Sequence, residues 1–371
     1  MEKSHIKHIF HNVRVLKCIN CNSITIPEAT KYFCESLVSA ESSELTESEY
    51  EYDFDKIVNR FLTDKFITSK VGFLYDRDDY YFFPGLQRPW NIGYLTPIYF
   101  NIEVLLKYSH HPEYSLELGA DTYGYIYKGD QSFIPFGINN NGKVIMWLGD
   151  IQGLDLNEQH YLRSENILSE NNIFSQFYEA QIGNIWADPS KENRIFSKRK
   201  ELHEKTLGSY KLSISQLEPE TLKEAGTIIR PIVSTLEAFS KVIISMNKIF
   251  VESISKKGLG NFLKNNFNIK IDGLGSNKLF QLWLDNCTDI NNAANIVSPL
   301  FVLYDLRIAM AHLQSEETKE ELISKSCERL ELDIDCRDYL VIYDRLLDRI
   351  EEMYTTIIDS NFIEIKVNED E

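Results

Sequence analysis

The chain has 371 residues, of which 43% are hydrophobic, and it carries a formal net charge of -17 at pH 7. This length is sufficient for two or three domains, and the hydrophobic content is ordinary for a globular protein. The acidic excess argues against broad, non-specific binding of nucleic acid. The sequence has no apolar run near twenty residues and no signal-peptide core, so we expect a cytoplasmic protein without membrane contact.

The first motif along the chain is the pair Cys18 and Cys21, which follows His5, His8 and His11. One such pair with nearby histidines can hold zinc, but a second pair at zinc-finger spacing is missing. Ordinary reduced thiols are therefore the preferred interpretation. We expect neither a metal nor a cofactor.

The region up to residue 147 predicts a mixed, strand-rich fold. Residues 42–52 are acidic and polar and predict a loop, whereas 54–66 have the apolar spacing of a helix. Between residues 80 and 147, aromatic and β-branched residues alternate with turn signals, and 114–118 alternates as a half-buried strand does. The Asn-Gly step within 139–142 predicts a tight hairpin.

Residues 155–205 are polar and aromatic with few clear periods, and we expect them to pack against the sheet. We place the domain boundary near 209–219. Residues 1–210 then form a mixed α/β domain for sensing or substrate recognition, and residues 215–371 form an all-α helical bundle. The fold class is α+β.

The helical half contains several predicted elements. Residues 222–255 predict one long helix or two, divided or kinked at Pro231. The glycines in 258–260 predict a break, with a short helix around Leu263 and another over 278–286.

Ser298-Pro299 is typical of a helix start, and the apolar stripe that follows predicts a helix to Leu313. A last amphipathic helix is predicted over 338–358.

The run Asp305-Leu306-Arg307-Ile308-Ala309-Met310-Ala311-His312 carries the chemistry of this half. Arginine is a permanent cation that suits a phosphate, and histidine moves protons near neutral pH. A nuclease that works without metal needs such a pair. Arg307 and His312 are therefore the candidate catalytic residues, with Asp305 in support.

An Arg-x4-His motif late in a helical bundle resembles the HEPN superfamily, and here the resemblance covers roughly residues 217–358. It implies a metal-independent endoribonuclease in which an RNA 2′-hydroxyl attacks its adjacent phosphate, leaving a 2′,3′-cyclic phosphate. His312 would be the general acid or base and Arg307 would hold the phosphate. The resemblance also implies a homodimer, and a toxin or anti-phage defence effector controlled by an inhibitor or trigger partner.

Helix geometry also favours a dimer. At about 100° per residue, Arg307 and His312 lie roughly 140° apart around a regular helix. We therefore expect that they cannot share one pocket of a single subunit, and that a twofold axis brings two copies together. Asp305 lies about 10 Å from His312 along such a helix, so we expect it to reach the facing helix.

The RNA-contact candidates come from a basic cluster that precedes the helical half. Its central members are Lys198, Arg199 and Lys200. A solvated helix face or linker also explains such a cluster.

The alternative to a nuclease is a non-catalytic, dimerising interaction protein with a partner- or ligand-binding N-terminal domain. In that case Arg307 makes a surface ion pair and His312 complements the helix dipole.

Overall fold

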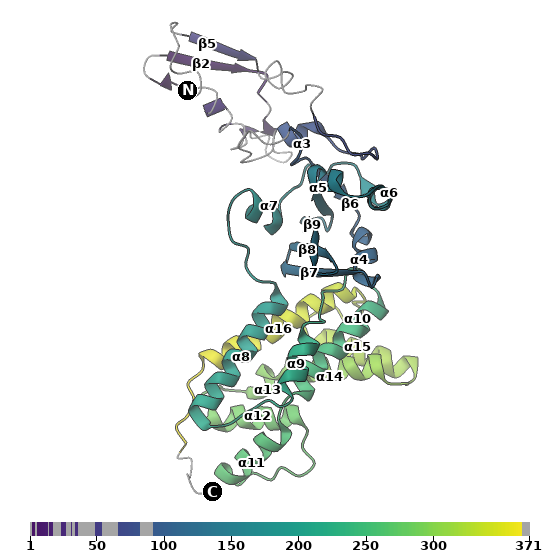
Figure 1. Ribbon diagram of the computed structural model, residues 1–371. Helices are drawn as coiled ribbons and strands as arrows, with labels where there is room; N and C mark the ends of the chain where they lie inside the picture. The colour runs from purple at the N-terminus through teal and green to yellow at the C-terminus, as the bar shows by residue number, and fades with distance from the viewer. Residues whose placement is uncertain are drawn as a thin grey trace. The chain divides into compact units, whose positions relative to one another are not determined.

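The computed structural model describes residues 2–3, 6–13, 15–17, 24–26, 31, 34–35, 49–53, 66–81 and 92–365 (Figure 1). The chain forms two compact units, Met1–Asp188 and Pro189–Glu371. The first is strand-rich and the second helical, which confirms the α+β fold class. The division falls earlier than the sequence predicted, because helix α8 (Lys191–Tyr210) packs along helix α16 (Tyr339–Asp359) in the second unit.

The first unit contains a six-stranded sheet with the strand order β11-β6-β10-β9-β8-β7, in which neighbouring strands are antiparallel. The strands are β6 (Pro97–Phe100), β7 (Tyr114–Ala120), β8 (Tyr123–Lys128), β9 (Gln131–Ile138), β10 (Val144–Trp147) and β11 (Asn166–Ile167). The predicted strand at 114–118 is confirmed within β7. The hairpin between β9 and β10 is also confirmed, since Gly142 has a φ of 71° and its N–H donates to Asn139 O at 2.9 Å.

Short helices surround this sheet. They are α3 (Arg77–Tyr81), the 3-10 helix η1 (Ile102–Leu105), α4 (Leu106–His110), α5 (Leu148–Gly153), α6 (Leu156–Ser164) and α7 (Gln176–Gln181). Phe177 of α7 is fully buried, and its ring stacks on Trp147 of β10 at 4.8 Å between centroids. A Cβ at Gly137 would lie 2.7 Å from the Cβ of Phe177, so this close approach requires glycine. The prediction that residues 155–205 pack on the sheet is therefore confirmed for α7, but it is wrong for residues 191–205, which lie in α8 and pack along α16.

A buried carboxylate joins α6 to α4 and β7. Glu158 accepts hydrogen bonds from Lys107 Nζ at 2.5 Å, Tyr114 Oη at 2.5 Å and Tyr108 Oη at 2.9 Å. The ammonium of Lys107 also lies 4.6 Å from the ring centroid of Tyr161, within cation–π distance. Burial by itself raises the pKa of Glu158, but the hydrogen bonds outweigh burial and lower it overall. The cluster is a satisfied ionic network inside the first unit.

Two small sheets lie nearer the N-terminus. One has the order β1-β2-β5 and the other pairs β3 with β4; the strands are β1 (Glu2–Lys3), β2 (Ile6–His11), β3 (Leu16–Lys17), β4 (Ile24–Thr25) and β5 (Glu49–Asp53). The loop predicted over 42–52 is wrong for residues 49–52, which lie in strand β5 and pair in parallel with β2. Residues 42–48 lie outside the described residues. The described residues include neither Cys18 nor Cys21. Of the helix predicted over 54–66, they include only Phe66.

The second unit is a helical bundle (Figure 1). After α8 it contains α9 (Glu218–Ala225), α10 (Leu236–Asn247), the π-helix η2 (Lys248–Glu252), α11 (Lys256–Phe267), α12 (Ser276–Cys287), α13 (Ala293–Ile296), α14 (Ser298–Ala311), α15 (Glu316–Arg329) and α16. Helix α14 is central, because it buries Leu300, Leu303 and Leu306 and contacts α10, α15 and α16.

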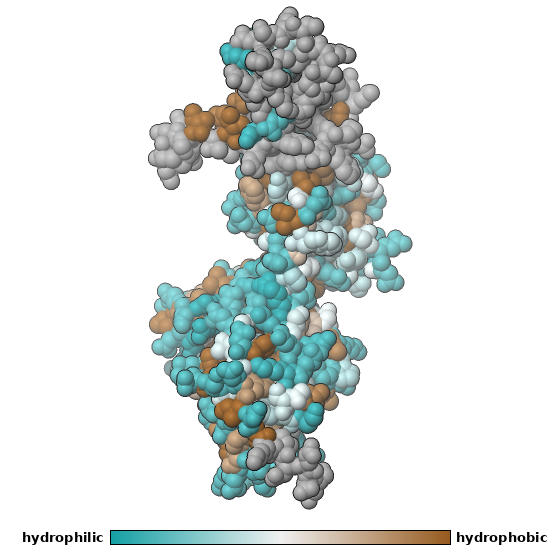
Figure 2. Space-filling view, turned by 90° about the vertical axis from the view of Figure 1, so that its left-hand side faces the viewer, coloured by the Kyte–Doolittle hydropathy of each residue, from teal (hydrophilic) through white to brown (hydrophobic). Residues whose placement is uncertain are grey.

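Polar residues cover most of this unit's visible surface (Figure 2). No helix in the described part of the chain is long and apolar enough to span a membrane.

Several helix predictions can be compared with this bundle. Pro231 separates α9 from α10, and the predicted last helix matches α16. The break predicted at 258–260 is wrong, because these residues lie inside α11. That helix begins after Ser255, whose Oγ accepts from Gly258 N at 3.1 Å. The glycine at 260 is suited to a tight contact instead, since a Cβ there would lie 2.9 Å from Ile271 Cδ1.

Candidate functional site

The site begins where α14 ends. The last helical residue is Ala311, and His312 is extended, with φ −106° and ψ 142°. Its N–H still donates to Ile308 O at 3.3 Å, and the side chain of Gln314 donates to the same carbonyl at 3.2 Å. The helix therefore ends one residue before His312. The rotation of about 100° per residue of a regular helix does not apply to this histidine.

This early end brings the two candidate catalytic side chains together within one chain. Arg307 Nη1 lies 2.6 Å from His312 Nε2. A guanidinium only donates hydrogen bonds, so Nε2 is the acceptor in this contact. The prediction that Arg307 and His312 cannot share a pocket of one subunit is wrong. His312 is exposed, and the Arg307 side chain is 28% exposed, so both can meet a ligand from solvent.

Two residues that the sequence did not single out complete this cluster. The π-helical turn η2 continues α10 and places Glu252 Oε1 3.8 Å from Arg307 Nη2. Asn247 Nδ2 donates to the same carboxylate oxygen at 2.8 Å. Single π-turns are rare and concentrate at functional sites. Nothing in the spacing of Asn247 and Glu252 signals such a turn, so the sequence could not reveal this part of the site.

Asp305 has a different role from the one predicted. Its Oδ2 accepts from Arg329 Nη1 at 3.0 Å, and Arg329 Nη2 also donates to Ser298 O at 3.2 Å. Burial raises the pKa of Asp305, and the neighbouring Arg329 opposes that rise. Asp305 therefore joins α14 to α15 within its own chain.

The three basic RNA-contact candidates lie on α8. Arg199 is only 6% exposed, and its Nη2 donates to Glu218 Oε1 at 2.7 Å and to Ser253 Oγ at 3.1 Å. Its prediction as an RNA contact is wrong, because the guanidinium ties α8 to α9 and to the end of η2. Lys198 Nζ donates to Thr355 Oγ1 at 2.7 Å. Lys200 alone of these three has a largely exposed side chain, 3.8 Å from Glu204.

His203, which lies beside Arg199 and Glu218 on the inner side of α8, makes the stability of the second unit depend on pH. Burial, with a contribution from Arg199, lowers the pKa of His203 to about 4 from an ordinary 6.5. The unfolded chain therefore binds more protons than the folded chain between these values, and stability falls as the pH drops from 6.5 to 4. We expect a loss of up to about 3 kcal/mol from this group. Urea unfolding across this range measures it.

The matched variant for that measurement is His203→Gln, which should flatten the pH dependence between pH 6.5 and 4. Some pH dependence of stability should remain below about pH 4.5, because the pKa of Glu218 is also lowered on folding. Burial raises the pKa of Glu218, but hydrogen bonds from Arg199 and Ser215 outweigh burial and lower it. A variant slope equal to the wild-type slope over the whole range would contradict the assignment.

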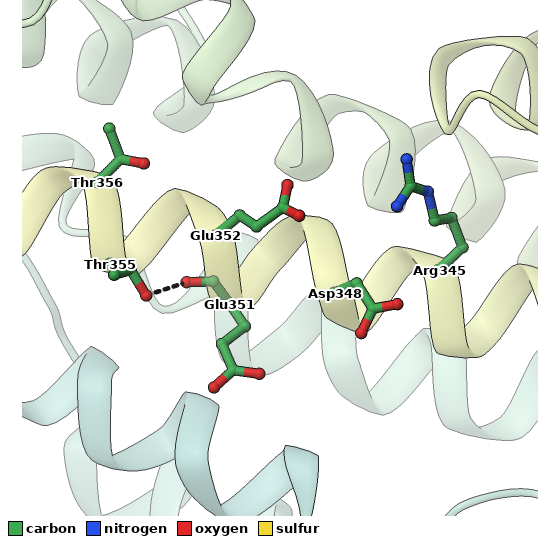
Figure 3. Close-up of a pocket in the computed structure, with 6 residues that line it drawn as sticks. All are labelled: Arg345, Asp348, Glu351, Glu352, Thr355 and Thr356. Carbon is green, nitrogen blue, oxygen red and sulfur yellow. Dashed lines mark hydrogen bonds between the residues drawn. The ribbon is translucent and has the colours of Figure 1, made fainter.

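A groove of about 430 Å³ runs along α16 (Figure 3). It is lined by Arg345, Asp348, Glu351, Glu352, Thr355 and Thr356. Asp348 and Glu351 point toward α8, where they pair with Lys191 at 2.5 Å and Arg194 at 3.0 Å. Three of the six lining side chains are carboxylates, so the groove is unsuited to an RNA backbone.

The cluster at the end of α14 is therefore the candidate functional site, since it joins a cation for phosphate to groups that can move protons. In the described part of the chain, no group of three or more His, Cys, Asp or Glu side chains is arranged to hold a metal ion. Comparison of the chain with protein-family models, curated proteins and solved structures gave no match.

Proposed function

We propose that the chain is a metal-independent endoribonuclease with Arg307 and His312 in its active site. The observation that carries this proposal is the 2.6 Å contact between Arg307 Nη1 and His312 Nε2 at the exposed end of α14. Arg307 binds the scissile phosphate through charge-assisted hydrogen bonds and stabilises charge that grows in the transition state. His312 transfers a proton during the same step.

In the proposed reaction, the 2′-hydroxyl of RNA attacks the adjacent phosphorus and the bond to the 5′-oxygen breaks. The products are a 2′,3′-cyclic phosphate and a 5′-hydroxyl. The nucleophile belongs to the substrate, so the protein supplies only a phosphate clamp and proton transfer. These are the two capacities that an arginine and a histidine in contact provide.

The strand-rich first unit is proposed as a sensing or substrate-recognition domain, and the whole chain as a toxin or anti-phage defence effector. With a net charge of -17, contact with RNA has to be local. Control by an inhibitor partner belongs to the same proposal: a trigger releases the inhibitor, and the chain purified without the inhibitor is active.

A homodimer remains part of this proposal, but one chain now contains both site residues. We therefore expect that a mixture of the inactive variants Arg307→Ala and His312→Ala stays inactive, because no chain in the mixture has an intact site. Cleavage of total RNA by the two variants, co-expressed and purified together, measures this. Recovery of activity in the mixture would contradict a site within one chain.

The proposed function is tested by incubating the purified chain with total RNA in EDTA. The expected result is fragmentation by the wild type and intact RNA with either alanine variant. If all three proteins cleave alike, or none does, the nuclease proposal fails, and the non-catalytic interaction protein becomes the better explanation.

A further inference from the structure

We infer that Glu252 is a third catalytic residue of this site, acting as the general base that activates the 2′-hydroxyl, with His312 as the general acid. This inference rests on the proposed ribonuclease function and deepens it. It assigns a complete set of proton-transfer groups to one chain.

The guanidinium of Arg307 lies between two groups that can exchange protons. His312 Nε2 contacts its Nη1 at 2.6 Å, and Glu252 Oε1 faces its Nη2 at 3.8 Å. A guanidinium binds a phosphate in a bidentate manner through such paired nitrogens. A phosphate held by Arg307 would therefore have the carboxylate near one end and the imidazole near the other.

Transphosphorylation of RNA needs two proton transfers, one at each end of the reacting phosphate. Glu252 takes the proton from the 2′-hydroxyl as the 2′-oxygen forms its bond to phosphorus. Protonated His312 gives its proton to the 5′-oxygen as the bond from phosphorus to that oxygen breaks. The step leaves protonated Glu252 and neutral His312, and exchange with water restores both.

The assignment of base and acid follows from the ordinary chemistry of the two groups. A carboxylate is unprotonated at neutral pH, whereas an imidazole can carry a proton there. The Glu252 side chain is 52% exposed, so a substrate hydroxyl can approach it. In the free protein His312 accepts from Arg307, and a phosphate that takes up the guanidinium's donors frees Nε2 to bind a proton.

Asn247 is the positioning residue for Glu252. It is 1% exposed, and its Nδ2 donates to Glu252 Oε1 at 2.8 Å. Its Oδ1 has no hydrogen-bond partner among the described residues, which is unfavourable for a buried polar atom. A buried amide kept at this cost, directly before the π-turn, holds one carboxylate oxygen in a fixed place.

The first test compares Glu252→Gln with the wild type on total RNA. Glutamine keeps an oxygen that accepts from Asn247 but cannot act as a base at neutral pH. We expect kcat to fall roughly 10²–10⁴-fold with KM within a few-fold of the wild-type value. Glu224→Gln is the matched control, since Glu224 contacts the same π-turn through Lys248 Nζ at 3.0 Å, and it should cleave at the wild-type rate.

The second test separates base from acid with an oligonucleotide that copies a site cut in total RNA and carries a 5′-bridging sulfur at that position. A thiolate leaves without protonation, so loss of the general acid no longer matters. His312→Ala should regain most of its lost rate on this substrate, whereas Glu252→Gln should stay defective. Recovery of Glu252→Gln without recovery of His312→Ala would overturn the assignment of roles.

The failure of this inference differs from the failure of the proposed function. If the wild type cleaves, Arg307→Ala does not, and Glu252→Gln cleaves at the wild-type rate, then Glu252 is not the base although the nuclease proposal stands. If the wild type leaves RNA intact, both fail together.

Discussion

Replacing His312 by alanine is expected to slow RNA cleavage by roughly 10²–10⁴-fold, because the site loses the group that exchanges a proton with the substrate. Arg307→Ala should slow it by roughly 10²–10³-fold through loss of transition-state charge stabilisation. Arg307→Lys should remain strongly impaired, since an ammonium cannot reproduce the paired donors of the guanidinium. Single-turnover cleavage of labelled RNA measures each rate.

The controls for these variants are an arginine and a histidine outside the site. Arg349 on α16 has a side chain 29% exposed, against 28% for Arg307, so Arg349→Ala matches the loss of charge and contact. His160→Ala on α6 removes an exposed histidine. Both should cleave at the wild-type rate. Equal losses in the control and site variants would show that the effect is not catalytic.

The double variant Arg307→Ala, His312→Ala sharpens this prediction. Groups that act on one transition state as a unit show strongly non-additive losses. The double variant should therefore be little slower than the worse single variant. Independent, multiplying losses would contradict a shared site.

The largest expected effect on stability lies in the first unit, at Glu158. Glu158→Ala leaves the ammonium of Lys107 and the hydroxyls of Tyr108 and Tyr114 without their shared acceptor. Breaking a buried ion pair by removing one partner costs about 3–5 kcal/mol. Hydrogen exchange of the amides in β7 and β8, read by mass spectrometry, measures this loss within the first unit.

The matched control is Glu117→Ala, which removes an exposed carboxylate from β7 itself. It should change the stability by no more than about 0.5 kcal/mol. If the amides of β7 and β8 were equally protected in the two variants, the predicted contribution of the Glu158 network to stability would be contradicted.

The sequence predicted those elements whose patterns are local. Asn-Gly at the β9–β10 turn and the apolar stripe of α16 each depend on neighbouring residues, and both predictions are confirmed. Helix α15 was not predicted, because its surface is acidic and its buried stripe is narrow, comprising Ile323, Ser326 and Cys327. The boundary between the units was placed too late because α8 belongs to its unit through contacts with the distant α16.

The candidate site could likewise be predicted from the sequence only in part. Arg307 and His312 were identifiable from residue type and spacing, but their relation depended on where the helix ends. That end is set by the extended backbone of His312 and by the Gln314 side chain, which regular helix geometry cannot anticipate. Glu252 reaches Arg307 through a π-turn some fifty residues earlier in the chain, a tertiary contact without a local signal.

The most direct measurement of the central claim compares two oligonucleotides that share one cleaved sequence, one all-ribose and the other with a single 2′-deoxy sugar at the scissile nucleotide. In EDTA, we predict that the wild-type chain cuts the first to a 2′,3′-cyclic phosphate and a 5′-hydroxyl, and leaves the second intact at that position. Cleavage of the deoxy-substituted strand there, or products with 5′-phosphate ends, would contradict an active site built on Arg307 and His312.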